Sequence, residues 1–257
     1  MAVTQFAVAA TCTLTRSLAD ADASSTMADE DLHLGIAGSS ACRKADRLRQ
    51  ERERRKSERS PLGRAWAGVF PSVEDRKRLA DERHWRTGAE GEQNLAALLA
   101  KRCPDVPMLH DRAVPRSRAN IDHIAITLSG VYVIDCKRYK GKIEVASPLF
   151  GKPKLKIAGR DRTKLIDGLD KQVAHVKAAL ADIPEDVPIH GCLCFVAPEG
   201  FLADVGLPVL RTLKINGYRL YYPKRLAKRL NQDGPITVDQ AQRLKEDLAR
   251  CLPPAFP

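Results

Sequence analysis

The sequence lacks the cysteine and histidine spacings that commonly hold zinc. Its seven cysteines are scattered without a CxxC pair, and its six histidines form neither HxxxH nor HExxH. These absences exclude zinc fingers, zinc ribbons and the HExxH class of zinc hydrolases. An odd number of scattered thiols also argues against a disulfide framework and fits a reducing compartment, so we expect a cytoplasmic protein.

Long apolar runs and aromatic residues are also scarce. No stretch approaches the roughly 20 apolar residues of a membrane-spanning helix. The opening MAVTQFAVAATCTL is mildly apolar but lacks the basic start of a signal peptide. We therefore expect neither a signal peptide nor a membrane partner. Aromatic residues make up only 5% of the chain, which gives little support to base stacking on single-stranded nucleic acid.

Positive charge, by contrast, is in excess. The chain has 43 Lys and Arg against 32 Asp and Glu, a formal net charge of +11 at pH 7. Such a balance favours a polyanionic partner, with nucleic acid the first candidate and an anionic membrane surface the second. A soluble protein with a basic tail would have the same composition, so composition alone leaves these alternatives open.

Three regions of the chain differ in composition. Residues 1–40 are rich in Ala, Ser, Thr and Asp without periodicity, and predict a disordered N-terminus. Residues 41–73 predict a charged helix and a linker. Within them, residues 43–59 hold nine basic and four acidic residues, which favours a solvated helix with i,i+4 ion pairs over a basic arm for nucleic acid. Residues 74–257 predict the compact domain.

The compact domain alternates helical and strand patterns. Helical periodicity covers residues 74–104, 163–184 and the C-terminal stretches 224–230 and 237–252. Strand patterns occupy the segments between and after the first two helices, namely 106–114, the hairpin 120–137, the basic hairpin 140–160, the continuous apolar run 188–198, and 217–223. This order predicts an α/β fold with a mixed central sheet flanked by helices.

The hairpin NIDHIAITLSGVYVIDCK, residues 120–137, places acids inside an apolar strand pair. With the turn centred on residues 128 and 129 and a loop of even length, cross-strand partners sum to 257 and Asp122 faces Asp135, whereas a three- or five-residue loop would break this facing. Lys137 leaves the same face as Asp135 because it lies two residues further along the strand. Two facing carboxylates repel and resist burial. Either a divalent cation or a salt bridge from Lys137 would compensate them.

Two further polar residues belong to apolar helical stripes. Glu92 lies three residues before Leu95 and seven before Leu99, so it points toward the buried side of its helix, whereas Glu90 points away. Gln172 shares a stripe with apolar residues of the second long helix. Each alone is compatible with a surface side chain that reaches water. Together with the hairpin acids they favour one polar cluster.

These residues carry a family resemblance. GAEGE at 88–92, IDHIAITLSGVYVIDCKRYKG at 121–141 and DKQVAHV at 170–176 resemble the nuclease-related domain (NERD) family. That family is assigned to the restriction-endonuclease-like PD-(D/E)XK fold. The resemblance extends over about residues 83–180 and implies a mixed sheet flanked by helices.

The resemblance also implies roles for the polar cluster. Asp122 and Asp135 become metal carboxylates for Mg²⁺ or Mn²⁺, with Glu92 as the helical acid of the opening motif and a further possible ligand. Lys137 matches the lysine of the (D/E)XK triplet, and Gln172 matches the amide of the later helix. The implied activity is metal-assisted hydrolysis of nucleic acid, DNA first. Ile121 departs from the proline of the parent motif, and His123, on the opposite strand parity, is interpreted as a supporting residue.

Basic residues of the second hairpin are candidates for phosphate contacts. They equally serve solubility, and comprise Lys140, Lys142, Lys152, Lys154, Arg160 and Arg162. Three functional hypotheses result: a Mg²⁺-dependent nuclease, a non-catalytic nucleic-acid-binding module that keeps the fold, and an interaction protein whose hairpin acids only form a salt bridge.

Overall fold

The computed structural model describes residues 34–62, 66, 69–117, 119–147, 151–183, 186–197, 205–206 and 212–255. Most of the predicted disordered N-terminus, residues 1–33, lies outside the described residues. Residues 34–40 lie inside them and include the buried side chain of Ala37. The packed structure therefore begins before residue 41.

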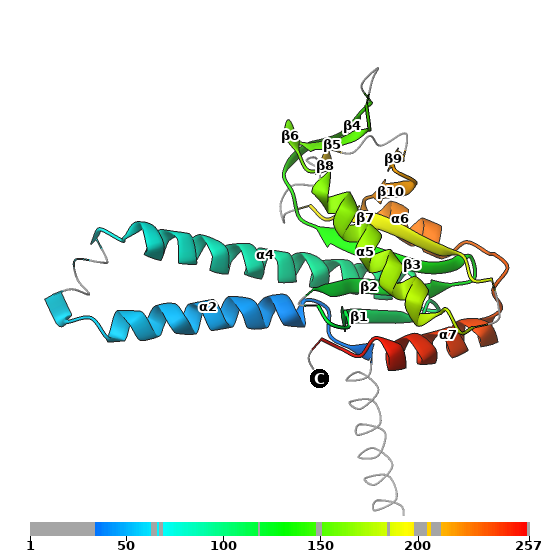
Figure 1. Ribbon diagram of the computed structural model, residues 1–257, viewed down its shortest axis with the longest axis horizontal. Coiled ribbons are helices and arrows are strands. Elements are labelled where there is room, and N and C mark those ends of the chain that lie inside the picture. Colours follow the sequence, from blue (N-terminus) through cyan, green and yellow to red (C-terminus); the bar gives the residue numbers. More distant parts are fainter. Residues whose placement is uncertain are drawn as a thin grey trace, which may run out of the picture.

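A six-stranded mixed sheet forms the centre of the molecule, with strand order β1-β2-β3-β7-β10-β9 (Figure 1). The first three strands are antiparallel, β3, β7 and β10 run parallel, and β9 returns antiparallel to β10. Their bounds are β1 Met108–Ala113, β2 Asn120–Thr127, β3 Gly130–Lys137, β7 Ile189–Phe195, β9 Leu213–Ile215 and β10 Tyr218–Tyr221.

Helices cover both faces of this sheet. Helices α5 (Lys164–Ala179) and α7 (Val238–Cys251) enclose one apolar cluster against the sheet. Helices α4 (Val73–Arg102) and α6 (Pro223–Leu230) enclose a second cluster on the other face. Alternate residues of β3 supply the two clusters, because successive strand side chains point to opposite faces. The predicted mixed sheet flanked by helices is confirmed.

Helix α2 (Ser39–Ser57) lies along the first half of α4, and together they form a helical arm that projects from the sheet (Figure 1). The expected i,i+4 pairs occur, as in Arg49–Glu53 at 3.0 Å. The interpretation of a solvated helix was nevertheless incomplete, because further ion pairs cross to α4. These are Arg52–Glu82, Arg55–Glu74, Arg59–Asp75, Arg78–Glu51 and Arg86–Asp46.

Strand β1 anchors two helices through adjacent charged residues. The Asp111 carboxylate accepts hydrogen bonds from the hydroxyl groups of Ser39 and Ser40 and from the Ser40 amide, so it caps the start of α2. Buried Arg112 donates from Nε to the Leu252 carbonyl at 2.6 Å and from Nη2 to the Ala249 carbonyl at 2.9 Å. Arg112 thereby satisfies carbonyls at the end of α7.

A second sheet, which we call the basic wing, stands beyond the end of β3 (Figure 1). Its strand order is β6-β5-β4-β8. The predicted basic hairpin is confirmed, since β4 pairs antiparallel with β5. Ile143, Leu155 and Ile157 turn inward and join the core, which leaves the basic residues outward. The bounds are β4 Gly141–Ala146, β5 Lys154–Ile157, β6 Arg160–Asp161 and β8 Val205–Gly206.

Candidate active site

The β2–β3 hairpin has the predicted register. Ile124 pairs with Val133 and Ile126 pairs with Val131, so partners sum to 257. The regular ladder ends at the His123–Ile134 pair, one position before Asp122. There Asp122 Oδ2 accepts a hydrogen bond from the Cys136 amide at 2.8 Å. The carboxylate thus takes the place of a backbone acceptor where the two strands separate.

Lys137 joins the two hairpin acids on one face. Its Nζ lies 2.6 Å from Asp135 Oδ1 and 3.9 Å from Asp122 Oδ2. The same Nζ donates to the Cys136 carbonyl at 3.0 Å. Asp122 and Asp135 are only 7% and 5% exposed. The structure therefore brings both predicted carboxylates and the predicted lysine into one cluster, which together with Glu92 we call the acid cluster.

Helix α4 packs against the end of β3 at Gly91. A Cβ atom placed there would lie 3.4 Å from the Arg138 Cβ and 3.9 Å from the Cys136 Sγ. The next residue on the helix, Glu92, is buried as predicted. Glu90 faces away, as predicted, and accepts from Arg138 Nη1 at 2.6 Å. Helix α4 thus brings Glu92 next to the end of β3.

Two oxygen atoms at the site have no hydrogen-bond donor among the described residues. They are Glu92 Oε2 and Gln172 Oε1, and both are buried. The amide nitrogen of Gln172 lies 3.5 Å from Asp135 Oδ1, so its oxygen is held beside the acid cluster from the α5 side. Buried oxygens without donors cost free energy unless a ligand or water satisfies them.

Burial and mutual repulsion dominate the electrostatics of these acids. Burial, followed by repulsion from Asp122, raises the pKa of Glu92 to about 9. Burial raises the pKa of Asp122 to about 7 even though Lys137 opposes the shift. Burial alone would lower the pKa of Lys137, but attraction to Asp135 and Asp122 outweighs it and raises the value. One ammonium therefore stands among three carboxyl groups, and the cluster favours additional positive charge.

The donor set at this site fits Mg²⁺ or Mn²⁺. It consists of oxygens only, it is rich in carboxylates, and two of its oxygens lack donors, which are the properties that hard divalent cations select. Within the described ranges, no group of three or more His, Cys, Asp and Glu side chains is already arranged around one point. The three expected acidic ligands, Asp122, Asp135 and Glu92, are therefore neighbours rather than a preassembled ligand shell.

Histidine 123 lies on the opposite side of β2 from the acids. Its Nδ1 is 2.8 Å from Nδ1 of His110 on β1, and the two rings meet edge to face. This contact supports its interpretation as a supporting residue. Sequence reasoning missed His110 and Arg138. The signal for Arg138 was available, because it follows Lys137 directly and so points toward the layer that contains α4.

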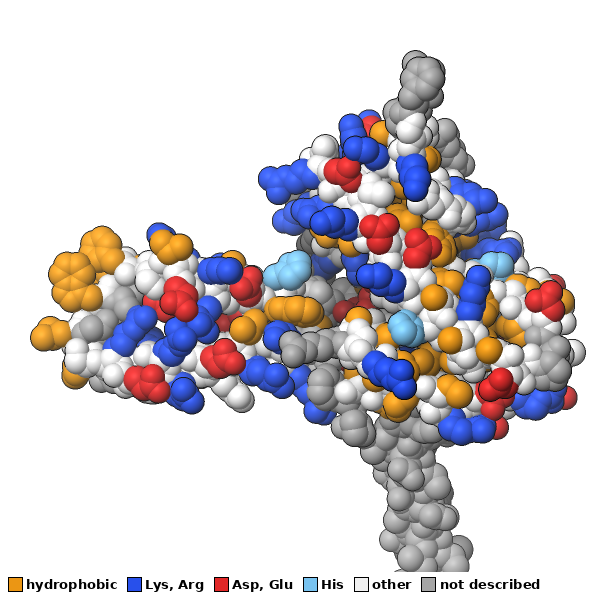
Figure 2. Space-filling view, in the orientation of Figure 1, with side chains coloured by type: hydrophobic (Ala, Val, Ile, Leu, Met, Phe, Trp, Pro, Cys, Tyr) orange, Lys and Arg blue, Asp and Glu red, His pale blue; other side chains and the backbone are white. Residues whose placement is uncertain are grey.

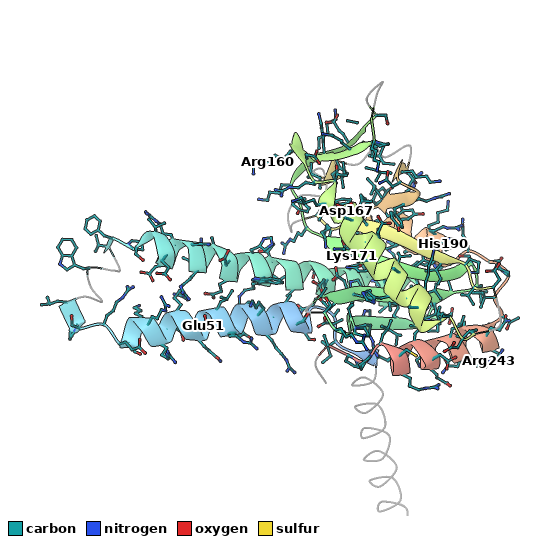
Figure 3. The ribbon with its side chains drawn as sticks, in the orientation of Figure 1. Glu51, Arg160, Asp167, Lys171, His190 and Arg243 are labelled. Carbon is teal, nitrogen blue, oxygen red and sulfur yellow. The ribbon has the colours of Figure 1, made fainter. Side chains whose placement is uncertain are left out.

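The predicted phosphate-contacting residues all lie on or beside the basic wing. Lys140, Lys152 and Arg160 are exposed, and Arg160 stands at the edge of the wing in Figure 3. Two others are engaged, since Lys142 pairs with Glu144 at 2.6 Å and Lys154 with Asp161 at 3.4 Å. The guanidinium of Arg162 lies 5.5 Å from the centre of the Tyr139 ring. Figure 2 shows Lys and Arg side chains gathered over this wing.

Comparison with family models matched part of the chain. Residues 87–196 match the model of the family described as "Nuclease-related domain" (NERD), whose known fold is PD-(D/E)XK. The matched range begins before Glu92 and ends after β7, so it contains the whole acid cluster. No curated protein and no solved structure matched the chain. None of the described helices combines the length and the apolar character needed to cross a bilayer.

Proposed function

We propose that this protein is a metal-dependent nuclease that hydrolyses DNA phosphodiester bonds, since residues 87–196 match the nuclease-related domain model. One observation carries the proposal. Two buried carboxylates share a face with Lys137 at the end of a central strand, and unsatisfied oxygens of Glu92 and Gln172 lie beside them. This arrangement costs stability and has an obvious use in binding a cation and a phosphate.

Asp122 and Asp135 would hold the metal ion, with Glu92 as a third ligand that α4 supplies. When bound, Mg²⁺ or Mn²⁺ lowers the pKa of a water molecule and polarises the scissile phosphate. Gln172 positions Asp135 through its amide nitrogen. The ligand oxygens come from α4 and from the sheet that it covers, so the fold itself sets their spacing.

Lys137 has a separate role in the proposal. Its ammonium stays protonated because the adjacent acids raise its pKa. It would orient the attacking water and stabilise the negative charge that develops on the phosphoryl oxygens. In the structure this ammonium is bound to Asp135 at 2.6 Å. Neutralisation of the acids by the metal would release it toward the substrate.

The basic wing supports nucleic acid as the substrate. Exposed Lys140, Lys152 and Arg160 lie on strands and loops that continue directly from the end of β3. A duplex carries a phosphate charge every few ångströms, so a row of separated cations can follow its backbone without reading sequence. The wing would therefore position DNA while the acid cluster cuts it.

One observation favours a second candidate, a non-catalytic nucleic-acid-binding module. Lys137 already forms a 2.6 Å ion pair with Asp135, so a salt bridge compensates part of the acid charge without a metal. A domain that had lost catalysis would keep such a pair for structural reasons, because an unpaired buried charge is costly.

A cleavage assay separates these candidates. Purified full-length protein is incubated with plasmid and linear DNA in the presence of Mg²⁺, Mn²⁺ or a chelator. Lys137→Ala removes the proposed catalytic ammonium, and Lys171→Ala removes an exposed lysine of α5 as the matched control (Figure 3). The nuclease proposal expects metal-dependent cleavage that only Lys137→Ala abolishes. DNA binding without cleavage in either metal would favour the non-catalytic module.

A further inference from the structure

The far end of the helical arm carries exposed apolar side chains, which we call the arm tip. Its members are each between 67% and 78% exposed, and they are Leu62, Trp66, Val69, Phe70 and Val73. Trp66 and Phe70 stack with ring centres 5.4 Å apart. Single exposed apolar residues are ordinary, but a contiguous group with two aromatic rings marks an interaction surface.

The rest of the arm makes this group stand out. The described side chains of α2 beyond its first turn are charged or polar apart from Ala45 and Leu48, and ion pairs link the helix to α4. Figure 2 shows the apolar side chains concentrated at the end of the arm that is farthest from the central sheet. The arm tip therefore contributes nothing to the core of the domain and exposes apolar surface at a cost to solubility.

The charge around the arm tip is strongly positive. Residues 54–78 contain eight Lys and Arg against three Asp and Glu, a surplus of five positive charges. All three acids pair with arginines of the same stretch, since Glu58 pairs with Arg54, Glu74 with Arg55 and Arg78, and Asp75 with Arg59. Exposed Lys56, Arg76 and Lys77 flank the apolar group. Its partner should therefore be anionic and apolar together.

We propose that the arm tip inserts into the headgroup region of an anionic lipid bilayer and tethers the protein to the membrane surface. Aromatic and aliphatic side chains bordered by Lys and Arg match the apolar interior and the anionic surface of such a bilayer. A protein partner fits less well, because a stable interface buries about 800 Å² on each side. A narrow projecting tip of five side chains offers no such flat or concave area.

The length of α4 would set the distance between the membrane surface and the acid cluster. Glu92 follows Val73 by nineteen residues along one continuous helix, which corresponds to about 28 Å at about 1.5 Å per residue. That distance is several times the Debye length of about 8 Å at physiological salt. An arm held upright would keep the acid cluster clear of the lipid charge, so membrane attachment and the reaction at the site are independent.

Vesicle flotation with the full chain tests the proposal. Phosphatidylcholine vesicles with and without phosphatidylserine are compared, using wild type, Trp66→Ser/Phe70→Ser and the control Trp85→Ser. Trp85 is a suitable control because it is the other tryptophan of the chain, lies on the same arm and is 41% exposed. We expect wild type and Trp85→Ser to float with the anionic vesicles. The double variant should partition at least about tenfold more weakly, because it loses two large apolar anchors.

Tryptophan fluorescence separates insertion from simple charge attraction. In Trp85→Phe, Trp66 is the sole tryptophan, and its emission should shift to the blue when anionic vesicles are added. Equal flotation of wild type and the double variant, or no emission shift, would overturn the proposal. A blue shift that grows with protein concentration without vesicles would overturn it in favour of a second copy of the chain. Loss of DNA cleavage would bear only on the nuclease proposal.

Discussion

Asp111 on β1 and Asp122 on β2 are buried acids on adjacent strands, but their surroundings differ. Asp111 accepts hydrogen bonds from Ser39, Ser40 and the Asn120 amide, all within 2.6 Å. Asp122 accepts one backbone amide hydrogen bond, lies 3.9 Å from an ammonium and has two other carboxyl groups for neighbours. We call the group around Asp111 the anchor cluster; the group around Asp122 is the acid cluster.

The difference shows which buried polar groups hold the fold and which do not. The anchor cluster has enough donors for its charge, and it attaches the helical arm to the sheet. The acid cluster has too few donors, with Glu92 Oε2 and Gln172 Oε1 left unsatisfied among the described residues. A saturated network rigidifies a structure, whereas an unsatisfied one stores free energy that a ligand can recover. We therefore expect the two clusters to respond to substitution in opposite ways.

The largest expected effect is on cleavage. Asp135→Asn should lower the rate of DNA cleavage by about 10³-fold or more, because it removes a proposed metal carboxylate and the acid that pairs with Lys137. The rate is measured on plasmid DNA in Mg²⁺. Asp161→Asn on the basic wing, an exposed position, serves as the control and should retain most of the activity. Comparable loss in both variants would place the critical charge outside the acid cluster.

The second prediction concerns stability in metal-free buffer. Asp111→Ala should lower the free energy of unfolding by about 3 kcal/mol, because it leaves the hydrogen-bond donors of Ser39, Ser40 and Asn120 without their acceptor. Asp122→Asn should change it by less than about 1 kcal/mol or raise it, because the amide carries no charge to desolvate. Urea unfolding monitored by circular dichroism measures both. A strongly destabilising Asp122→Asn would mean that the acid cluster also holds the fold.

The third prediction adds the metal. Saturating Mg²⁺ should stabilise the wild-type protein by about 2 kcal/mol, since a ligand that binds only the folded state shifts unfolding by mass action. Asp122→Asn should lose most of this gain, whereas Asp111→Asn should keep it. The shift in unfolding midpoint with Mg²⁺ concentration gives the measurement. Equal metal responses in the two variants would contradict the assignment of Asp122 as a ligand.

The sequence predicted the acid cluster better than the anchor cluster, for a physical reason. A two-residue turn and strict alternation determine the hairpin register, so Asp122, Asp135 and Lys137 were placed by local rules. Helical periodicity likewise turned Glu92 inward. Asp111 has no such pattern, because its partners on α2 lie about seventy residues away. Its positive φ of 47° is also a property that only the folded chain displays.

Other features depended on packing between distant segments and were not predictable. The pairing of α2 with α4 arises from interhelical ion pairs such as Arg59–Asp75 at 2.8 Å, which a composition rich in both charges does not specify. The end of the strand ladder at His123 was also missed, because the Asp122 side chain replaces a backbone acceptor there. Short-range rules thus predicted which residues meet at the site, and tertiary contacts decided how they are bonded.

The smallest expected effect concerns two histidines that lie between the two clusters. His110 precedes Asp111, His123 follows Asp122, and their Nδ1 atoms are 2.8 Å apart, a spacing that leaves room for one proton between them. Burial, followed by repulsion from Arg112, lowers the pKa of His110 to about 4, and burial with repulsion from His110 lowers the pKa of His123. Below its unfolded pKa of about 6.5, each histidine binds more protons in the unfolded chain than in the folded one.

Above about pH 6.5 both histidines are neutral in the folded and the unfolded chain, and they do not lower the free energy of unfolding. As the pH falls from about 6.5 toward about 4, each histidine lowers the free energy of unfolding by at most about 1.4 kcal/mol per pH unit. His110→Gln removes one titrating group and keeps a donor for His123. Between pH 6.5 and pH 5, the variant should lose about 1.5 kcal/mol less than wild type, as measured by urea unfolding at each pH. His175→Gln, on α5 away from the pair, should follow the wild-type curve. If His110→Gln follows it as well, the acid sensitivity does not arise from this histidine.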